Sequence, residues 1–274
     1  MRLLFIGDIV GKGGRGAVRH LVPELRREYG CAFVVANAEN IAGGGGITRK
    51  CIDSLADAEV DVFTSGDHVW DQRGFAEEIV TLPHLLRPAN FCPEQPGRGH
   101  AVFTAADGTR VGVLCLVGRT FMNGLGNCPF QAATSAVAEL RRETPVIVVD
   151  FHAEATSEKI ALGRFLDGRV SAVLGTHTHV ETADQTVFPG GTAYHTDVGM
   201  VGAVESVLGR AIGPVIQRFA TGMPARFTVV EKGIALHATL VDIEPATGRA
   251  SHIERIVRRL DAGDEDGEPD HEMP

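Results

Sequence analysis

The sequence predicts an α/β fold in which mixed β-sheets are flanked by helices. Short runs of β-branched and other apolar residues recur along the chain without polar alternation, which is typical of strands covered on both faces. Segments with helical spacing lie between these runs, and glycines end several elements of both kinds. Because strands and helices alternate, neighbouring strands are expected to pair in parallel through right-handed crossovers.

The first part of the chain gives this alternation most clearly. The predicted order is a strand "RLLFIG", a helix "GAVRHLVPELRREYG" that ends at Gly30, a strand "CAFVVAN", a helix "TRKCIDSLADAE" capped by Thr48, and a strand "VDVFTSG". A glycine just after a helix and a threonine just before one are common termination and capping signals.

The rest of the chain adds antiparallel pieces to this pattern. The predicted order is a hairpin "AVFTAADGTRVGVLCLVG" that turns at Asp107-Gly108, a loop "FMNGLGNCPF", a helix "QAATSAVAELRRE", a strand "PVIVVDFHA", a helix "SEKIALGRFLDG" and a strand "VSAVLG". Short β segments in "TVFPGGTAYHT" follow, and then a hairpin "RFTVVEKGIALHATLVDIE" with its turn at Lys232-Gly233. Asp-Gly and Lys-Gly pairs between apolar runs favour tight turns.

Composition indicates one domain over residues 1–260 and an acidic tail over 261–274 that we expect to be disordered. The tail holds seven acidic residues and no Lys or Arg, so the formal net charge of −9 falls to −2 without it. A body so close to neutral argues against binding of long nucleic acid. With no signal peptide or transmembrane run, we expect a cytoplasmic protein, and the five scattered cysteines indicate neither disulfides nor a thiolate metal site.

Residues able to bind a metal or move a proton follow five of the predicted strands. In an open α/β sheet, ligands bind at the carboxyl ends of the strands. Each of these residues alone could be an ordinary turn or core residue. Unrelated turns, however, would not be expected to place acids and histidines at the same end of five strands. The sequence therefore predicts a metal site built from Asp8, Glu39, Asn40, Asp67, His152, His177 and His179, with His68 beside it.

The residue types indicate which metals and which chemistry to expect. Carboxylate, amide and imidazole groups suit iron, manganese or zinc. Seven side chains are too many for one ion but fit two ions if a carboxylate bridges them, and paired ions are a common device for phosphate ester hydrolysis, in which a bridging hydroxide attacks phosphorus. His68 adjoins Asp67, so both cannot easily reach the same ion. We expect His68 to act as the general acid for the leaving group.

Four strings, "FIGDIVGKGGR", "NAENIAGGGGIT", "SGDHVWD" and "GTHTHV", resemble the YmdB-like branch of the calcineurin-like metallophosphoesterases over residues 1 to about 260. The resemblance implies a two-sheet sandwich and a cyclic nucleotide phosphodiesterase, notably for 2′,3′-cyclic AMP. It implies two metal ions, with iron favoured over manganese or zinc. It is compatible with a monomer or a homo-oligomer. One ion would be held by Asp8, Glu39, Asn40 and His179, and the other by Glu39, Asp67, His152 and His177, with His68 as proton donor.

This sequence departs from the wider superfamily at Val10, where a histidine is usual, and at Asp67, where asparagine is usual. The added charge of Asp67 is expected to favour a harder or more highly charged ion and to raise the pKa of His68.

Two alternative functions are kept. The string "GKGGRG" at residues 11–16 fits a dinucleotide-binding fingerprint, with Glu39 as the ribose-binding acid, and would indicate an NAD-dependent oxidoreductase. That interpretation leaves the four histidines unexplained. The other alternative is a non-catalytic regulator that uses the same fold to bind RNA or a protein. Cofactor fluorescence on adding NADH tests the first alternative, and loss of activity with a chelator would argue against the second.

Overall fold

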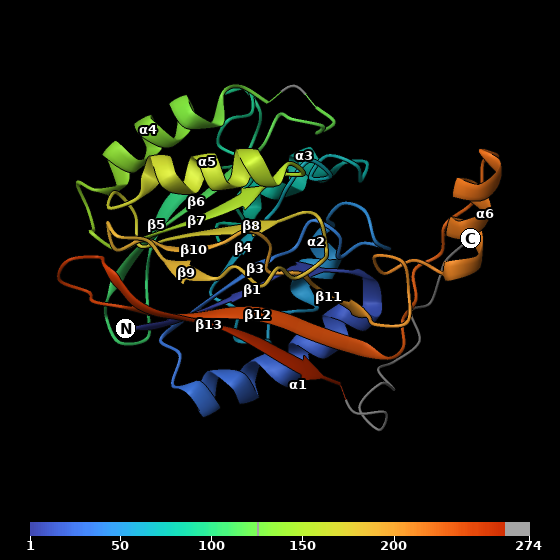
Figure 1. Ribbon diagram of the computed structural model, residues 1–274, viewed down its shortest axis with the longest axis horizontal. Coiled ribbons are helices and arrows are strands. Elements are labelled where there is room, and N and C mark those ends of the chain that lie inside the picture. The colour runs from blue at the N-terminus through green and yellow to red at the C-terminus, as the bar shows by residue number, and fades with distance from the viewer. Residues whose placement is uncertain (125, 261–274) are drawn as a thin grey trace.

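Two mixed β-sheets form in the described residues, 1–124 and 126–260, of the computed structural model, and they pack face to face (Figure 1). This confirms the predicted α/β sandwich. The first sheet runs in the order β2 (Asp8–Ile9), β11 (Met200–Ala203), β12 (Ile234–Ile243), β1 (Arg2–Ile6), β3 (Phe33–Asn37) and β4 (Val62–Thr64), with β13 (Ala250–Arg259) also paired to β12.

In the second sheet, three parallel strand pairs lie between an antiparallel strand pair at each edge. Its order is β5 (His100–Thr104), β6 (Arg110–Val117), β7 (Ile147–His152), β8 (Ala172–Thr176), β10 (Ala193–His195) and β9 (Thr186–Val187). The pairs β6–β7, β7–β8 and β8–β10 are parallel, as are β1–β3 and β3–β4 in the first sheet. The parallel pairing expected from strand–helix alternation is therefore confirmed.

Helices cover the outer faces of both sheets (Figure 1). Successive side chains of a strand point to opposite faces, so Leu3 and Phe5 of β1 join the core between the sheets while Leu4 and Ile6 pack toward α1 (Gly11–Tyr29). On the other side, α4 (Pro129–Leu140) and α5 (Thr156–Leu166) pack on the second sheet through a separate apolar core. Shorter helices are α2 (Arg49–Asp53), α3 (Phe75–Glu78), the 3₁₀ turn Ile79–Thr81 and α6 (Ile212–Thr221).

Most of the predicted helix caps and turns are confirmed. Gly30 ends α1 in a left-handed conformation, with φ of 62°, and the Thr48 side chain accepts a hydrogen bond from the backbone N–H of Cys51 at the start of α2. The hairpin turn at Asp107-Gly108 is present, because β5 and β6 pair in antiparallel fashion on either side of it. The helix predicted over residues 48–59 is shorter than expected, since α2 ends at Asp53 and the chain continues in turns.

The hairpin predicted around Lys232-Gly233 is wrong. Strand β12 begins at Ile234 and forms its hairpin with β13, through a turn over residues 244–249. Residues 226–230 instead lie beside the segment before α6, where Val230 donates a backbone hydrogen bond to Gly209. Because β12 is paired with β13 on one edge and with β1 and β11 on the other, it has no edge left for those residues.

The predicted tail, residues 261–274, lies outside the described residues, so its disorder remains a prediction. Within the described part of the chain, no helix has both the length and the apolar character needed to cross a membrane.

Candidate metal centre

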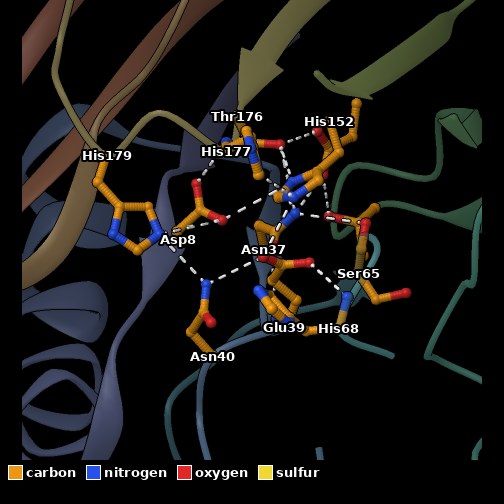
Figure 2. A network of polar contacts seen from close by, with 12 residues as sticks. Asp8, Asn37, Glu39, Asn40, Ser65, His68, His152, Thr176, His177 and His179 are labelled. Atoms are coloured by element: carbon orange, nitrogen blue, oxygen red, sulfur yellow. Dashed lines mark hydrogen bonds and ion pairs between the residues drawn. The ribbon is translucent and has the colours of Figure 1, made fainter. Parts of the chain in front are cut away.

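Polar side chains that follow the carboxyl ends of five strands lie close together, and Figure 2 shows most of them. Asp8 follows β1, the Glu39-Asn40 pair follows β3, and Asp67 follows β4 in the first sheet. The second sheet contributes His152 at the end of β7 and the histidines at 177 and 179 just after β8. The sequence-predicted residues are therefore gathered in one place, at the edge where sheet topology predicts ligand binding.

One half of the site is a tight cluster of carboxylates and imidazoles. One ligand atom each from Glu39, Asp67, His152 and His177 lies within 4.8 Å of all the others. The Nε2 atom of His152 is central: it lies 3.1 Å from Oε1 of Glu39, 3.2 Å from Oδ1 of Asp67 and 3.0 Å from Nδ1 of His177. These four residues are the set that the family resemblance implies for one of the ions.

The other half adjoins the first through Glu39. The Asn40 amide nitrogen lies 3.1 Å from Oε1 of Glu39 and 3.2 Å from Nε2 of His179. That histidine nitrogen lies 3.8 Å from Oδ1 of Asp8. The second implied set, Asp8, Glu39, Asn40 and His179, is thus also contiguous, and Glu39 touches members of both sets.

The donor set fits metal ions. A ring nitrogen carries at most one proton, so Nε2 of His152 cannot satisfy all three neighbours by hydrogen bonding. The Oδ1 atom of Asp8 is buried and has no hydrogen-bond partner in the described part of the chain. Buried carboxylate oxygens without partners are costly. Cations between these groups would neutralise the charge and use the free lone pairs, and an all-oxygen-and-nitrogen set suits iron, manganese or zinc.

Charge and burial shift the pKa values of the cluster in opposite directions. Burial raises the pKa of Asp8 well above its usual value. Burial also acts to raise the pKa of Glu39, but the charge of His152 outweighs it and the net pKa is lowered. For His177, burial and the neighbouring His152 lower the pKa to about 4, which leaves that imidazole neutral and able to bind a cation at neutral pH.

The histidine loop after β8 is held in an unusual backbone conformation. His177 and His179 have φ of 100° and 64°, which non-glycine residues rarely adopt. The carboxylate of Asp197 accepts the backbone N–H of Thr178 between them at 3.1 Å. Lys159 in turn donates to Asp197 at 2.6 Å and to the carbonyl of Thr176 at 2.7 Å. This buried pair holds the loop that aims both imidazoles.

His68 lies beside the cluster and not in it. Its Nδ1 atom lies 2.7 Å from Oδ2 of Asp71, and its side chain is 42% exposed. Burial acts to lower the pKa of His68, but the charges of Glu39, Asp67 and Asp71 outweigh it, and the net pKa is raised. The direction is the one expected from Asp67. A partly exposed histidine with a raised pKa, placed beside the cluster, has the properties of a proton donor.

Sequence reasoning missed several residues that support the site. Glu154 lies 3.2 Å from Nε2 of His177, and Asp71 is paired with His68. Asp71 lies well beyond the end of β4, so its position gave no signal, whereas Glu154 lies two residues after β7, as Glu39 does after β3, and its position could have marked it. Asp150, by contrast, is a charged residue inside an apolar strand, and that mismatch is a signal the sequence offered.

The glycine-rich string at residues 11–16 does not form a free phosphate-binding loop. These residues are the first turn of α1, and the backbone N–H of Gly13 donates to the Glu231 carboxylate. A side chain built at Gly11 would also meet Glu231. An acidic side chain therefore occupies the helix N-terminus where a dinucleotide pyrophosphate would bind. The dinucleotide-binding alternative has no structural support here.

Comparisons with known proteins show which family the chain matches. The family model described as "YmdB-like protein" matches residues 4–256. The 2′,3′-cyclic-nucleotide 2′-phosphodiesterase of Bacillus subtilis (strain 168) is 47% identical over 257 residues, which cover 94% of this chain and 97% of that protein.

Solved structures of similar proteins share the fold over nearly the same length. A hypothetical protein from Thermus thermophilus is 39% identical, with a TM-score of 0.86 over 94% of this chain and 99% of that one. A novel phosphatase from Mycoplasma pneumoniae is 31% identical, with a TM-score of 0.86 over 94% of this chain and 93% of that one.

Proposed function

This chain belongs to the family of YmdB-like proteins, and on that premise we propose that it is a metal-dependent phosphodiesterase that hydrolyses small cyclic nucleotides such as 2′,3′-cyclic AMP. The observation that carries the proposal is the position of Glu39 between two contiguous donor sets. The similarity to a 2′,3′-cyclic-nucleotide 2′-phosphodiesterase supports the substrate class.

Two metal ions are proposed, and each half of the site would supply ligands for one. Glu39 would be shared, with Asp67, His152 and His177 on one side and with Asp8, Asn40 and His179 on the other. Asn40 turns its amide nitrogen toward Glu39 and His179, so metal binding through its oxygen requires the amide to flip. When bound, the ions supply an activated water nucleophile and neutralise charge on the phosphoryl oxygens.

The residues of the chain carry out the remaining steps. His68 would donate a proton to the oxygen that leaves phosphorus, because it lies next to Asp67 without joining the cluster. Asp71 would keep the Nδ1 side of that ring engaged, so that Nε2 faces the leaving group. Lys159 and Asp197 hold the loop that presents His177 and His179.

The test combines metal analysis with a substrate comparison. The purified full-length chain should contain about two equivalents of iron, manganese or zinc and should hydrolyse 2′,3′-cyclic AMP, with loss of activity in EDTA and recovery on adding manganese. The isomeric 3′,5′-cyclic AMP is the matched substrate control. Absence of bound metal and of hydrolysis after reconstitution would refute the proposal.

A further inference from the structure

A buried carboxylate that the proposed mechanism does not use lies directly beneath the metal-binding cluster. Asp150 is in the middle of β7 and has no exposed surface. It accepts hydrogen bonds from the Asn37 amide nitrogen at 2.9 Å, from the Thr176 hydroxyl at 2.7 Å and from the Thr64 hydroxyl. Burying a carboxylate among neutral groups is costly, so its placement calls for a function.

The direction of these hydrogen bonds can be read from their chemistry. The oxygen of the Asn37 amide accepts the backbone N–H of Glu39 at 3.0 Å, which turns the amide nitrogen toward Asp150. The single proton of the Thr176 hydroxyl goes to Oδ1 of Asp150. The hydroxyl oxygen can therefore only accept from Nδ1 of His152, which lies 2.9 Å away.

This order of donors places a proton on Nδ1 of His152. In the neutral imidazole that a metal ion would bind, Nε2 then carries the free lone pair, and Nε2 is the atom that faces Glu39 and His177 (Figure 2) and also Asp67. The reverse direction would put the proton on Nε2 and block that lone pair. Partners of the far nitrogen of a metal-binding histidine commonly set its tautomer and orientation.

We propose that Asp150 is a positioning residue for the metal centre. It acts through the Thr176 hydroxyl on the tautomer and orientation of His152, and through Asn37 on the backbone at Glu39. One carboxylate of the second sheet thereby organises ligands from both sheets. This inference rests on the proposed metal site.

The decisive variant is Thr176→Val, which keeps the shape of the side chain and removes the hydroxyl. Zn²⁺ titration of the metal-free full-length chain should give a dissociation constant about 10- to 100-fold weaker than that of the unmodified chain. Thr176→Ser, which keeps the hydroxyl, should stay within about threefold of the unmodified value, on the same reasoning.

The matched control is Thr64→Val, which removes another donor to Asp150 without touching His152. It should lower thermal stability and leave Zn²⁺ affinity close to the unmodified value. Equal losses of affinity in Thr64→Val and Thr176→Val would mean that the network only supports the fold, and would overturn the proposal.

A spectroscopic measurement on the unmodified chain tests the same point even where a variant fails to fold. In the Zn²⁺-loaded protein, ¹⁵N NMR should show His152 with a slowly exchanging proton on Nδ1, and this signal should persist in Thr176→Ser. A proton on Nε2 would contradict the inference. If the unmodified chain binds no Zn²⁺ at all, the proposed metal site fails first, which distinguishes the two failures.

Discussion

Nε2 of His152 lies 3.1 Å from Oε1 of Glu39, and the two residues come from different sheets of the sandwich. Both side chains are almost completely inaccessible to solvent. Neither sheet alone brings this imidazole to this carboxylate. The site therefore exists only when the two sheets pack together, so folding and metal binding should be coupled.

Replacing His68 with alanine should separate catalysis from metal binding. We expect turnover to fall by roughly 10²- to 10⁴-fold, the usual contribution of a general acid, with bound metal close to two equivalents. Steady-state kinetics and elemental analysis of the same preparation measure both. A parallel loss of metal would identify His68 as a ligand.

Lys159→Met should strongly destabilise the fold, because it leaves the buried carboxylate of Asp197 without its cationic partner. Urea unfolding should show a loss of about 3–5 kcal/mol. Arg49→Met breaks the exposed ion pair with Asp53 and is the matched control, with an expected cost below about 1 kcal/mol. Similar costs for the two variants would show that the buried pair has no special role.

Asp184 should contribute a pH-dependent part of the stability. Burial acts to raise its pKa, but hydrogen bonds from Thr196 and Thr182 outweigh it and the net pKa is lowered. A lowered pKa in the folded state means stabilisation that is present above the unfolded pKa of about 3.9 and is lost as pH falls toward the folded value. In Asp184→Asn, the unfolding free energy should fall less steeply below pH of about 4 than in the unmodified chain. Identical slopes in urea unfolding would contradict this.

Truncation after Leu260 should leave activity and metal content unchanged, since all the proposed ligands and His68 lie before residue 180 and the supporting Asp197 lies before residue 200. Kinetics on the truncated chain, at matched metal loading, provide the check. A large drop in turnover would assign residues 261–274 a role at the site.

Much of the fold could be predicted because its strands are buried on both faces. Runs such as "VVAN" and "VIVVD" contain little polar alternation, and both form strands where expected. Strand β13 gave no such signal, because "ASHIERIVRR" leaves most of its side chains partly or fully exposed and has the composition of a polar segment. The hairpin error arose there, since the true partner of β12 could not be recognised.

The gathering of the candidate ligand residues could be predicted because strand ends meet at one edge by topology. The contacts that support the site could not, because they join side chains in loops that follow different strands of the second sheet. Glu154 faces His177, and Asp197 reaches Thr178, through distances that no spacing in the sequence encodes. Likewise, the residue type of His177 gives no signal of its positive φ.

The most direct test of a shared metal centre is the metal content of three alanine variants measured side by side. Because Glu39 adjoins both donor sets, Glu39→Ala should lose both ions. His177→Ala and His179→Ala should each lose chiefly one, with the other retained at close to one equivalent. A full metal complement in Glu39→Ala, or loss of both ions from each histidine variant alone, would contradict a centre in which Glu39 is shared between two ions.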